Sequence, residues 1–382
     1  MLRRLVPVVL ATVLAVSVLA VPTAAHATGA RAAECALPGR TGWTDEGHDT
    51  DHRQFHVATG RIRAVMLFVD FPDAVAEDDT AQYADHFAPA RQWLAAASYG
   101  RARLSITPVH KWFRMPQDNT AYGFDRGISY EQHRLYVRQA VSAADAEVDF
   151  SAYDIVYIVP SRNAAAVTFS PTYLWDPAQS GVVADGAEVK WGVTFGQDMW
   201  RWGYKVLAHE TGHIFGLPDL YSFTGPDYHR FVGGWDVMGL ISGPSPRPFA
   251  WHAWKLGWIS DGQVACVPTS GGTYRLTPVE LPGGRKLVVI KVSETSAYAI
   301  EARKGSACSG GVVIYKVDSA VATGEGPIRM MDAKPDAVAP AGCHPLDDGA
   351  YGPGEIFTDR SAGVRVEVSG DVVRIERRLG HA

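Results

Sequence analysis

Hydrophobic and polar positions divide the chain into a first region of alternating strands and helices and a second region of short strands. Residues 64–71 are almost all apolar, which predicts a strand buried on both faces. Apolar residues recur at spacings of three and four over 80–98, which predicts a helix. Continuous or alternating apolar positions predict further strands at 101–113, 153–159 and 189–195.

Three further helices are predicted mainly from signals at their ends. Ser129 and Gln132 match a capping box at the start of one helix. Asp198 is the expected N-cap of a second helix, which runs to about Phe215. The third helix covers 249–258, and its tryptophans are expected in the core.

After residue 260 the pattern changes to strands separated by loops. Ser369 and Gly370 predict a tight hairpin between the last two strands. Residues 319–351, rich in glycine and proline, predict a long loop. The region therefore predicts a small all-β domain of the sandwich type, with strands at 272–277, 286–292, 298–302, 312–317, 364–368 and 372–377.

The amino-terminal residues predict secretion. A basic start, an apolar run over 5–19 and the sequence Ala25-His26-Ala27 match a signal peptide at 1–27. No later run is long and apolar enough to predict a membrane anchor. Residues 28–60 are polar and predict an irregular leader or short pro-segment across the fold. Its histidines, His48, His52 and His56, are expected in a solvated loop.

Composition describes an ordinary globular protein with a mild negative charge. Hydrophobic residues make up 47% and charged residues 20% of the 382 residues, and the net charge is −5. Without clustered lysine and arginine, nucleic acid is not an expected partner. Four cysteines in a secreted chain predict two disulfides, for which three pairings are possible. The favoured pairing is Cys308–Cys343, which closes a local loop, with Cys35–Cys266.

The strongest chemical signal is the run H-E-x-x-H-x-x-G-x-x-D. His209 and His213 are four residues apart, so a helix directs both imidazoles toward one ion. Glu210 lies beside them as a general base for a zinc-activated water. Gly216 allows the chain to turn, so that Asp219 can be the third ligand. Alternatively, Asp219 caps a turn, and His229, His252 or a distant carboxylate completes the site.

The residues around this motif resemble the immune inhibitor A family of secreted metallopeptidases, relatives of the metzincins. The resemblance covers roughly residues 61–260, and it is carried by 209–221, 233–239, 64–73, 98–100, 153–160 and 253–258. It implies cleavage of protein or peptide substrates outside the cell, with His209, His213 and Asp219 as zinc ligands and Glu210 as base. It also implies that strand 189–195 is an edge strand that pairs with the substrate, and the alternative for this segment is an ordinary strand of the sheet.

The implied fold is of the α+β class. A metzincin-like domain at 61–260, with a mixed sheet and an active-site helix, precedes a β-rich domain at 261–382. The chain departs from the metzincin pattern at Asp219, where most members have histidine. Met238 matches the methionine beneath the metal, but no tyrosine follows two residues later. Tyr221 and Tyr228 are candidates for contacting a substrate carbonyl, although packing is the simpler role for both.

Two other readings of the same residues remain open. The chain can be a zinc hydrolase of cell-wall or other amide or ester substrates, or a non-catalytic secreted binding protein on the same scaffold. The expected protein is a monomer. Calcium is a further candidate ion, but the aspartates lack a D-x-D-x-D-G loop and favour solvated surface positions: Asp318, Asp347, Asp348 and Asp359.

Overall fold

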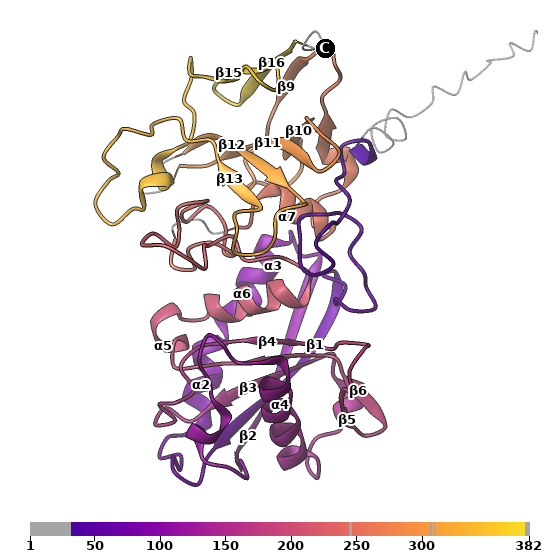
Figure 1. Ribbon diagram of the computed structural model, residues 1–382, viewed down its shortest axis with the longest axis vertical. Helices are drawn as coiled ribbons and strands as arrows, with labels where there is room; N and C mark the ends of the chain where they lie inside the picture. Colours follow the sequence, from indigo (N-terminus) through magenta and orange to yellow (C-terminus); the bar gives the residue numbers. More distant parts are fainter. Residues whose placement is uncertain (1–31, 244–246, 306–307, 309, 379–382) are drawn as a thin grey trace, which may run out of the picture.

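The computed structural model describes residues 32–243, 247–305, 308 and 310–378, so the expected signal peptide at 1–27 lies outside the described residues. A sheet flanked by helices is followed along the chain by a β-rich region (Figure 1). The predicted combination of α and β elements is therefore confirmed. Within the part that the structure describes, no helix is long and apolar enough to cross a membrane.

The first sheet is mixed, as expected. Four strands run parallel, and the fifth, β4, pairs antiparallel with β7 and ends the sheet. The prediction of an edge strand over 189–195 is wrong, because β7 lies between β3 and β4. In spatial order the strands are β2 (Ala102–Arg114), β1 (Gly60–Asp70), β3 (Ile155–Pro160), β7 (Trp191–Thr194) and β4 (Thr172–Leu174).

Strand β1 separates two hydrophobic cores. Alternate side chains over 64–69 enter opposite cores, which explains the continuous apolar run in the sequence. The larger core is packed by α2 (Thr80–Phe87), α3 (Pro89–Ala97) and α6 (Lys205–Ile214), and the smaller by α4 (Tyr130–Ala144) (Figure 1). A hairpin of β5 (Val182–Ala184) and β6 (Ala187–Val189) packs beside α4.

Helix boundaries follow local chemistry that the apolar pattern missed. The single helix predicted over 80–98 is wrong, because Pro89 lacks an amide hydrogen and begins a second helix instead. The capping box of Ser129 and Gln132 is confirmed at the start of α4.

The helix predicted from Asp198 to about Phe215 is also divided. Gly203 has a φ of 64° and separates α5 (Met199–Trp202) from α6. Asp198 precedes α5, but its carboxylate accepts hydrogen bonds from the amide and hydroxyl of Ser170 rather than capping the helix. The metal-ligand motif therefore lies on a helix that begins at Lys205.

The carboxyl-terminal region contains two sheets that share one core. The predicted hairpin at 369–370 is confirmed between the last two strands. The first sheet is β13 (Ile328–Met330), β12 (Gly311–Asp318), β11 (Ser296–Arg303), β10 (Leu287–Lys291) and β8 (Val264–Cys266), and the second is β14 (Ile356–Asp359), β15 (Val364–Ser369), β16 (Val372–Arg377) and β9 (Gly272–Arg275). Helix α7 (Ala250–Lys255) precedes them.

Within the leader predicted at 28–60, residues 35–59 are irregular as expected and run beside α7 (Figure 1), whereas Ala32 and Ala33 are helical. Below, the leader means residues 35–59. The favoured disulfides, Cys35–Cys266 and Cys308–Cys343, are both confirmed. His52 is exposed as expected, but the solvated position predicted for His48 is wrong. The ring of His48 packs against Trp251 and Trp254, at centroid distances of 4.6 and 3.9 Å.

The two disulfides are expected to contribute unequally to stability. Cys35–Cys266 joins residues 231 apart, whereas Cys308–Cys343 joins residues 35 apart. Because closing a longer loop removes more entropy from the unfolded chain, replacing the first pair by alanine should lower the free energy of unfolding by about 1–2 kcal/mol more. Urea unfolding without reductant measures both double variants, and an equal or larger loss in the Cys308, Cys343 variant contradicts the expectation.

Candidate metal centre

Helix α6 presents His209, Glu210 and His213 to one side of the structure. The imidazoles of His209 and His213 lie perpendicular, with ring centroids 4.9 Å apart, as the spacing of four residues predicts. The helix ends after Ile214, and Gly216, with a φ of 90°, turns the chain back. That turn carries Asp219 toward the two rings.

The three expected ligands converge. Oδ1 of Asp219 lies 3.1 Å from Nε2 of His209 and 3.3 Å from Nε2 of His213. One ligand atom from each of these three side chains lies within 4.8 Å of the other two. Among the described residues, this is the group of histidine, cysteine, aspartate or glutamate side chains that lie close enough together to hold a metal ion. Neither His229 nor His252 belongs to it, so the structure places the alternative third ligands elsewhere.

Both imidazoles are held in the orientation that a metal ligand needs. Nδ1 of His209 lies 2.8 Å from the carbonyl of Val237, and Nδ1 of His213 lies 2.8 Å from the carbonyl of Leu217. Because a carbonyl only accepts, each Nδ1 must donate its hydrogen. A neutral ring then has its lone pair on Nε2, which faces Asp219.

This donor set fits zinc. Two imidazole nitrogens and one carboxylate are typical of catalytic zinc sites, in which a fourth position stays open. Burial alone would lower the pKa of His213, but Asp219 outweighs it and raises that pKa to about 9, so zinc would have to displace a proton from this ring on binding. Burial opposes the charge of Asp219, yet the imidazoles keep the pKa of its carboxyl below its usual value. The same arrangement favours a cation.

Glu210 is buried beside the group and held by a residue that the sequence did not indicate. The Thr172 hydroxyl, on edge strand β4, donates to Oε2 of Glu210 at 2.8 Å. Burial raises the pKa of Glu210 to about 7.

Asp219 is also supported from a distant part of the chain. Its amide donates to the Thr323 hydroxyl at 2.9 Å, and its carbonyl accepts from the Gly324 amide at 3.2 Å. Both residues lie in the loop predicted over 319–351, so the carboxyl-terminal region helps to position the third candidate ligand. No local sequence pattern indicated this contact.

Met238 and Tyr221 both lie near the site. Met238 is fully buried beneath α6, and a Cβ added to Gly212 would come within 2.7 Å of its Sδ, so these two positions pack closely. Tyr221 lines the cleft, with its ring 6.1 Å from that of His209. Burial raises the pKa of Tyr221, and the nearby carboxylates of Asp219 and Glu210 raise it further. Tyr228 lines the same cleft and is 54% exposed.

The ligand group opens into a cleft of about 760 Å³. The leader forms part of its wall through Trp43 and Thr44, and β4 contributes Thr172 and Leu174. Thr323 adds a contact from the carboxyl-terminal region. The cleft is therefore built from sequence positions on both sides of the metal-ligand motif.

The solvated surface position expected for Asp347 and Asp348 is wrong, because both are buried. Two of the four suggested calcium ligands have well-defined partners of their own. Asp347 accepts from the amides of Gly234 and His344, and Asp359 accepts from the hydroxyls of Tyr298 and Ser361. These contacts support a structural role for the two carboxylates.

Comparison with known proteins adds no family: no family model matches this chain, and no curated protein is similar to it.

Removing Asp219 should abolish tight zinc binding. Changes around a ligand typically cost about 10–100-fold in metal affinity, so Asp219→Ala, which removes a ligand, should lose more than about 100-fold. Competition with a chromogenic chelator measures this affinity. Asp336→Ala, which removes an exposed aspartate, is the matched control and should bind like the wild type. Equal affinities in the two variants would exclude Asp219 as a ligand.

Proposed function

We propose that this chain is a secreted zinc-dependent endopeptidase of the immune inhibitor A type. The carrying observation is that His209, His213 and Asp219 converge next to the buried carboxylate of Glu210. A purely structural zinc site has no need of that carboxylate, and such sites are usually closed by cysteine and histidine. The site therefore favours hydrolysis over passive binding.

Each residue has a defined task in peptide hydrolysis. A zinc ion bound by the three side chains supplies Lewis acidity and a nucleophilic water at neutral pH. Glu210 takes the proton from the attacking water and passes it to the leaving amine. The Thr172 hydroxyl holds Oε2 of Glu210 during these transfers. The carbonyls of Val237 and Leu217 keep both imidazoles oriented.

A polypeptide substrate is supported by the edge of the first sheet. Strand β4 ends the sheet, and its residues Thr172 and Leu174 line the cleft. An extended peptide can pair with such an edge through backbone hydrogen bonds, which give affinity with little sequence preference. This assigns to β4 the substrate-pairing role that the sequence assigned to 189–195.

Exposed aromatic side chains around the cleft favour apolar groups of the substrate. Trp43 is 44% exposed, Phe223 52% and Tyr228 54%, and all three line the cleft. Large apolar side chains exposed together typically mark a binding surface. Two disulfides are consistent with an oxidising compartment outside the cell.

Substitutions of Glu210 and His213 should separate chemistry from metal binding. Glu210→Ala should keep its zinc while kcat/KM for casein falls by about 10²–10⁴-fold, because the proton acceptor is lost. His213→Ala should lose both zinc and activity. Elemental analysis and chelator-sensitive cleavage of denatured casein measure these outcomes, with muropeptides as alternative substrates. Full activity of Glu210→Ala would exclude the mechanism, and cleavage of muropeptides alone would exclude an endopeptidase.

Trp43 should affect substrate binding rather than catalysis. Truncating an aromatic contact at a binding surface costs about 1 kcal/mol, so Trp43→Ala should raise KM for an apolar peptide roughly fivefold, with kcat and zinc content unchanged. Val183→Ala, on the exposed β5–β6 hairpin, is the surface control. A changed kcat with an unchanged KM would contradict this role.

A further inference from the structure

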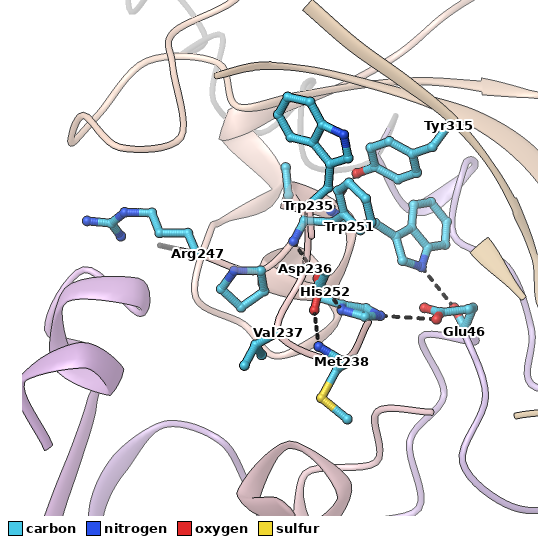
Figure 2. Close-up of polar contacts among 12 residues, drawn as sticks. Glu46, Trp235, Asp236, Val237, Met238, Arg247, Trp251, His252 and Tyr315 are labelled. Atoms are coloured by element: carbon cyan, nitrogen blue, oxygen red, sulfur yellow. Dashed lines mark hydrogen bonds and ion pairs between the residues drawn. The ribbon is translucent and has the colours of Figure 1, made fainter. Parts of the chain in front are cut away.

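Outside the ligand group, the structure contains a second cluster of ionisable side chains in the interior. Glu46, Asp236 and His252 are each 0% exposed (Figure 2). Nε2 of His252 lies 3.0 Å from Oε1 of Glu46, and Nδ1 of His252 lies 2.8 Å from Oδ2 of Asp236. One imidazole thus joins the leader to the segment that follows the metal-ligand motif.

The cluster is stabilised as an ionic unit. Burial alone would lower the pKa of His252, but Glu46 and Asp236 outweigh it and raise that pKa to about 10. A protonated imidazole donates from both nitrogens, so it hydrogen-bonds both carboxylates at once. Removing either partner would leave a buried charge without compensation, which is strongly destabilising.

Asp236 belongs both to this cluster and to the methionine loop, defined as residues 235–239. It therefore connects His252 to the backbone of that loop. Its carboxylate accepts from the amides of Met238, at 2.8 Å, and Phe249, at 2.6 Å. The loop then makes one contact with a candidate ligand and one with the neighbour of another. The Val237 carbonyl bonds Nδ1 of His209, and the Met238 carbonyl accepts from the amide of Leu220, next to Asp219.

Glu46 is itself held firmly by α7. The Trp251 indole donates to the Glu46 carbonyl at 3.1 Å, and the Lys255 ammonium bonds the carbonyl of Gly47. The ring of His48 packs between the two tryptophans of the helix. The leader is also tied covalently through Cys35. These contacts fix the backbone around Glu46, from which its carboxylate reaches His252.

We propose that Glu46 is a positioning residue for the metal centre: through His252 and Asp236 it fixes the methionine loop, and with it the orientation of His209. The inference rests on the proposed zinc site, but not on its substrate. It also makes the leader a permanent part of the catalytic unit rather than a removable pro-segment.

Zinc affinity of Glu46 variants tests the proposal without relying on activity. Glu46→Ala breaks the relay and should weaken zinc binding by about 10-fold or more, as loss of an outer-shell contact typically does. Glu46→Gln can still hydrogen-bond Nε2 of a neutral His252, so it should stay within about threefold of the wild type. Chelator competition gives the affinities, and the absorption of the cobalt-substituted protein reports ligand geometry. Circular dichroism identifies a temperature at which every variant is folded.

The matched control removes another leader contact that does not reach the methionine loop. Glu294→Ala removes the exposed ion pair with Arg40, so it should leave zinc affinity and the cobalt spectrum unchanged. If Glu46→Ala does not fold, Glu46→Asp, which withdraws the carboxylate by one methylene, takes its place with the same expectation of weaker binding.

Two affinity results overturn the proposal. One is a folded Glu46→Ala or Glu46→Asp variant with zinc affinity within twofold of the wild type, whatever its unfolding temperature. The other is an equal loss of affinity in Glu46→Ala and Glu46→Gln, because glutamine keeps the bond.

The proposed function fails separately if the wild type binds zinc but cleaves no protein. After reduction of the disulfides, mass spectrometry of the active secreted protein should show a chain that includes residue 46. An active protein whose chain lacks this residue would also overturn the proposal.

Discussion

Asp236 accepts three hydrogen bonds in the protein interior, from the amides of Met238 and Phe249 and from the imidazole of His252. These donors come from the methionine loop and from α7, so one carboxylate joins the two segments. Arg303 of strand β11 bonds the same region through the carbonyls of Trp235 and Pro248. The position of the Val237 carbonyl, and therefore of the His209 ring, depends on these buried charges.

This dependence explains why the candidate metal centre cannot be assigned to one contiguous part of the chain. The leader supplies Glu46 beneath the methionine loop, and the carboxyl-terminal region supplies Thr323, which accepts from the amide of Asp219. The larger core likewise contains residues on both sides of position 260, such as Trp258 and Val289. The β-rich region therefore supports the candidate site directly, whatever other role it has.

Sequence patterns predicted the features that depend on neighbouring residues. The continuous apolar run of β1, the capping box of α4 and the spacing of His209 and His213 follow from strand and helix geometry, and the structure shows them. Contacts between distant residues carry no such period. Glu46 and His252 are 206 residues apart, and Asp219 and Thr323 are 104 apart. A polar leader without an apolar stripe gave no sign that one of its glutamates would be fully buried.

The motif alone cannot prepare the two imidazoles for a metal. Helical spacing brings the rings together, but it does not decide which ring nitrogen keeps its hydrogen. That choice comes from the carbonyls of Val237 and Leu217, which lie outside the helix. Leu217 follows directly from the turn at Gly216, whereas Val237 reaches the site only because the methionine loop is held in place. Burying ionised groups for this purpose is costly, since apolar residues of the same shape often stabilise a protein more. The buried cluster of Glu46, His252 and Asp236 is therefore better explained by its effect on the orientation of His209 than by a contribution to stability.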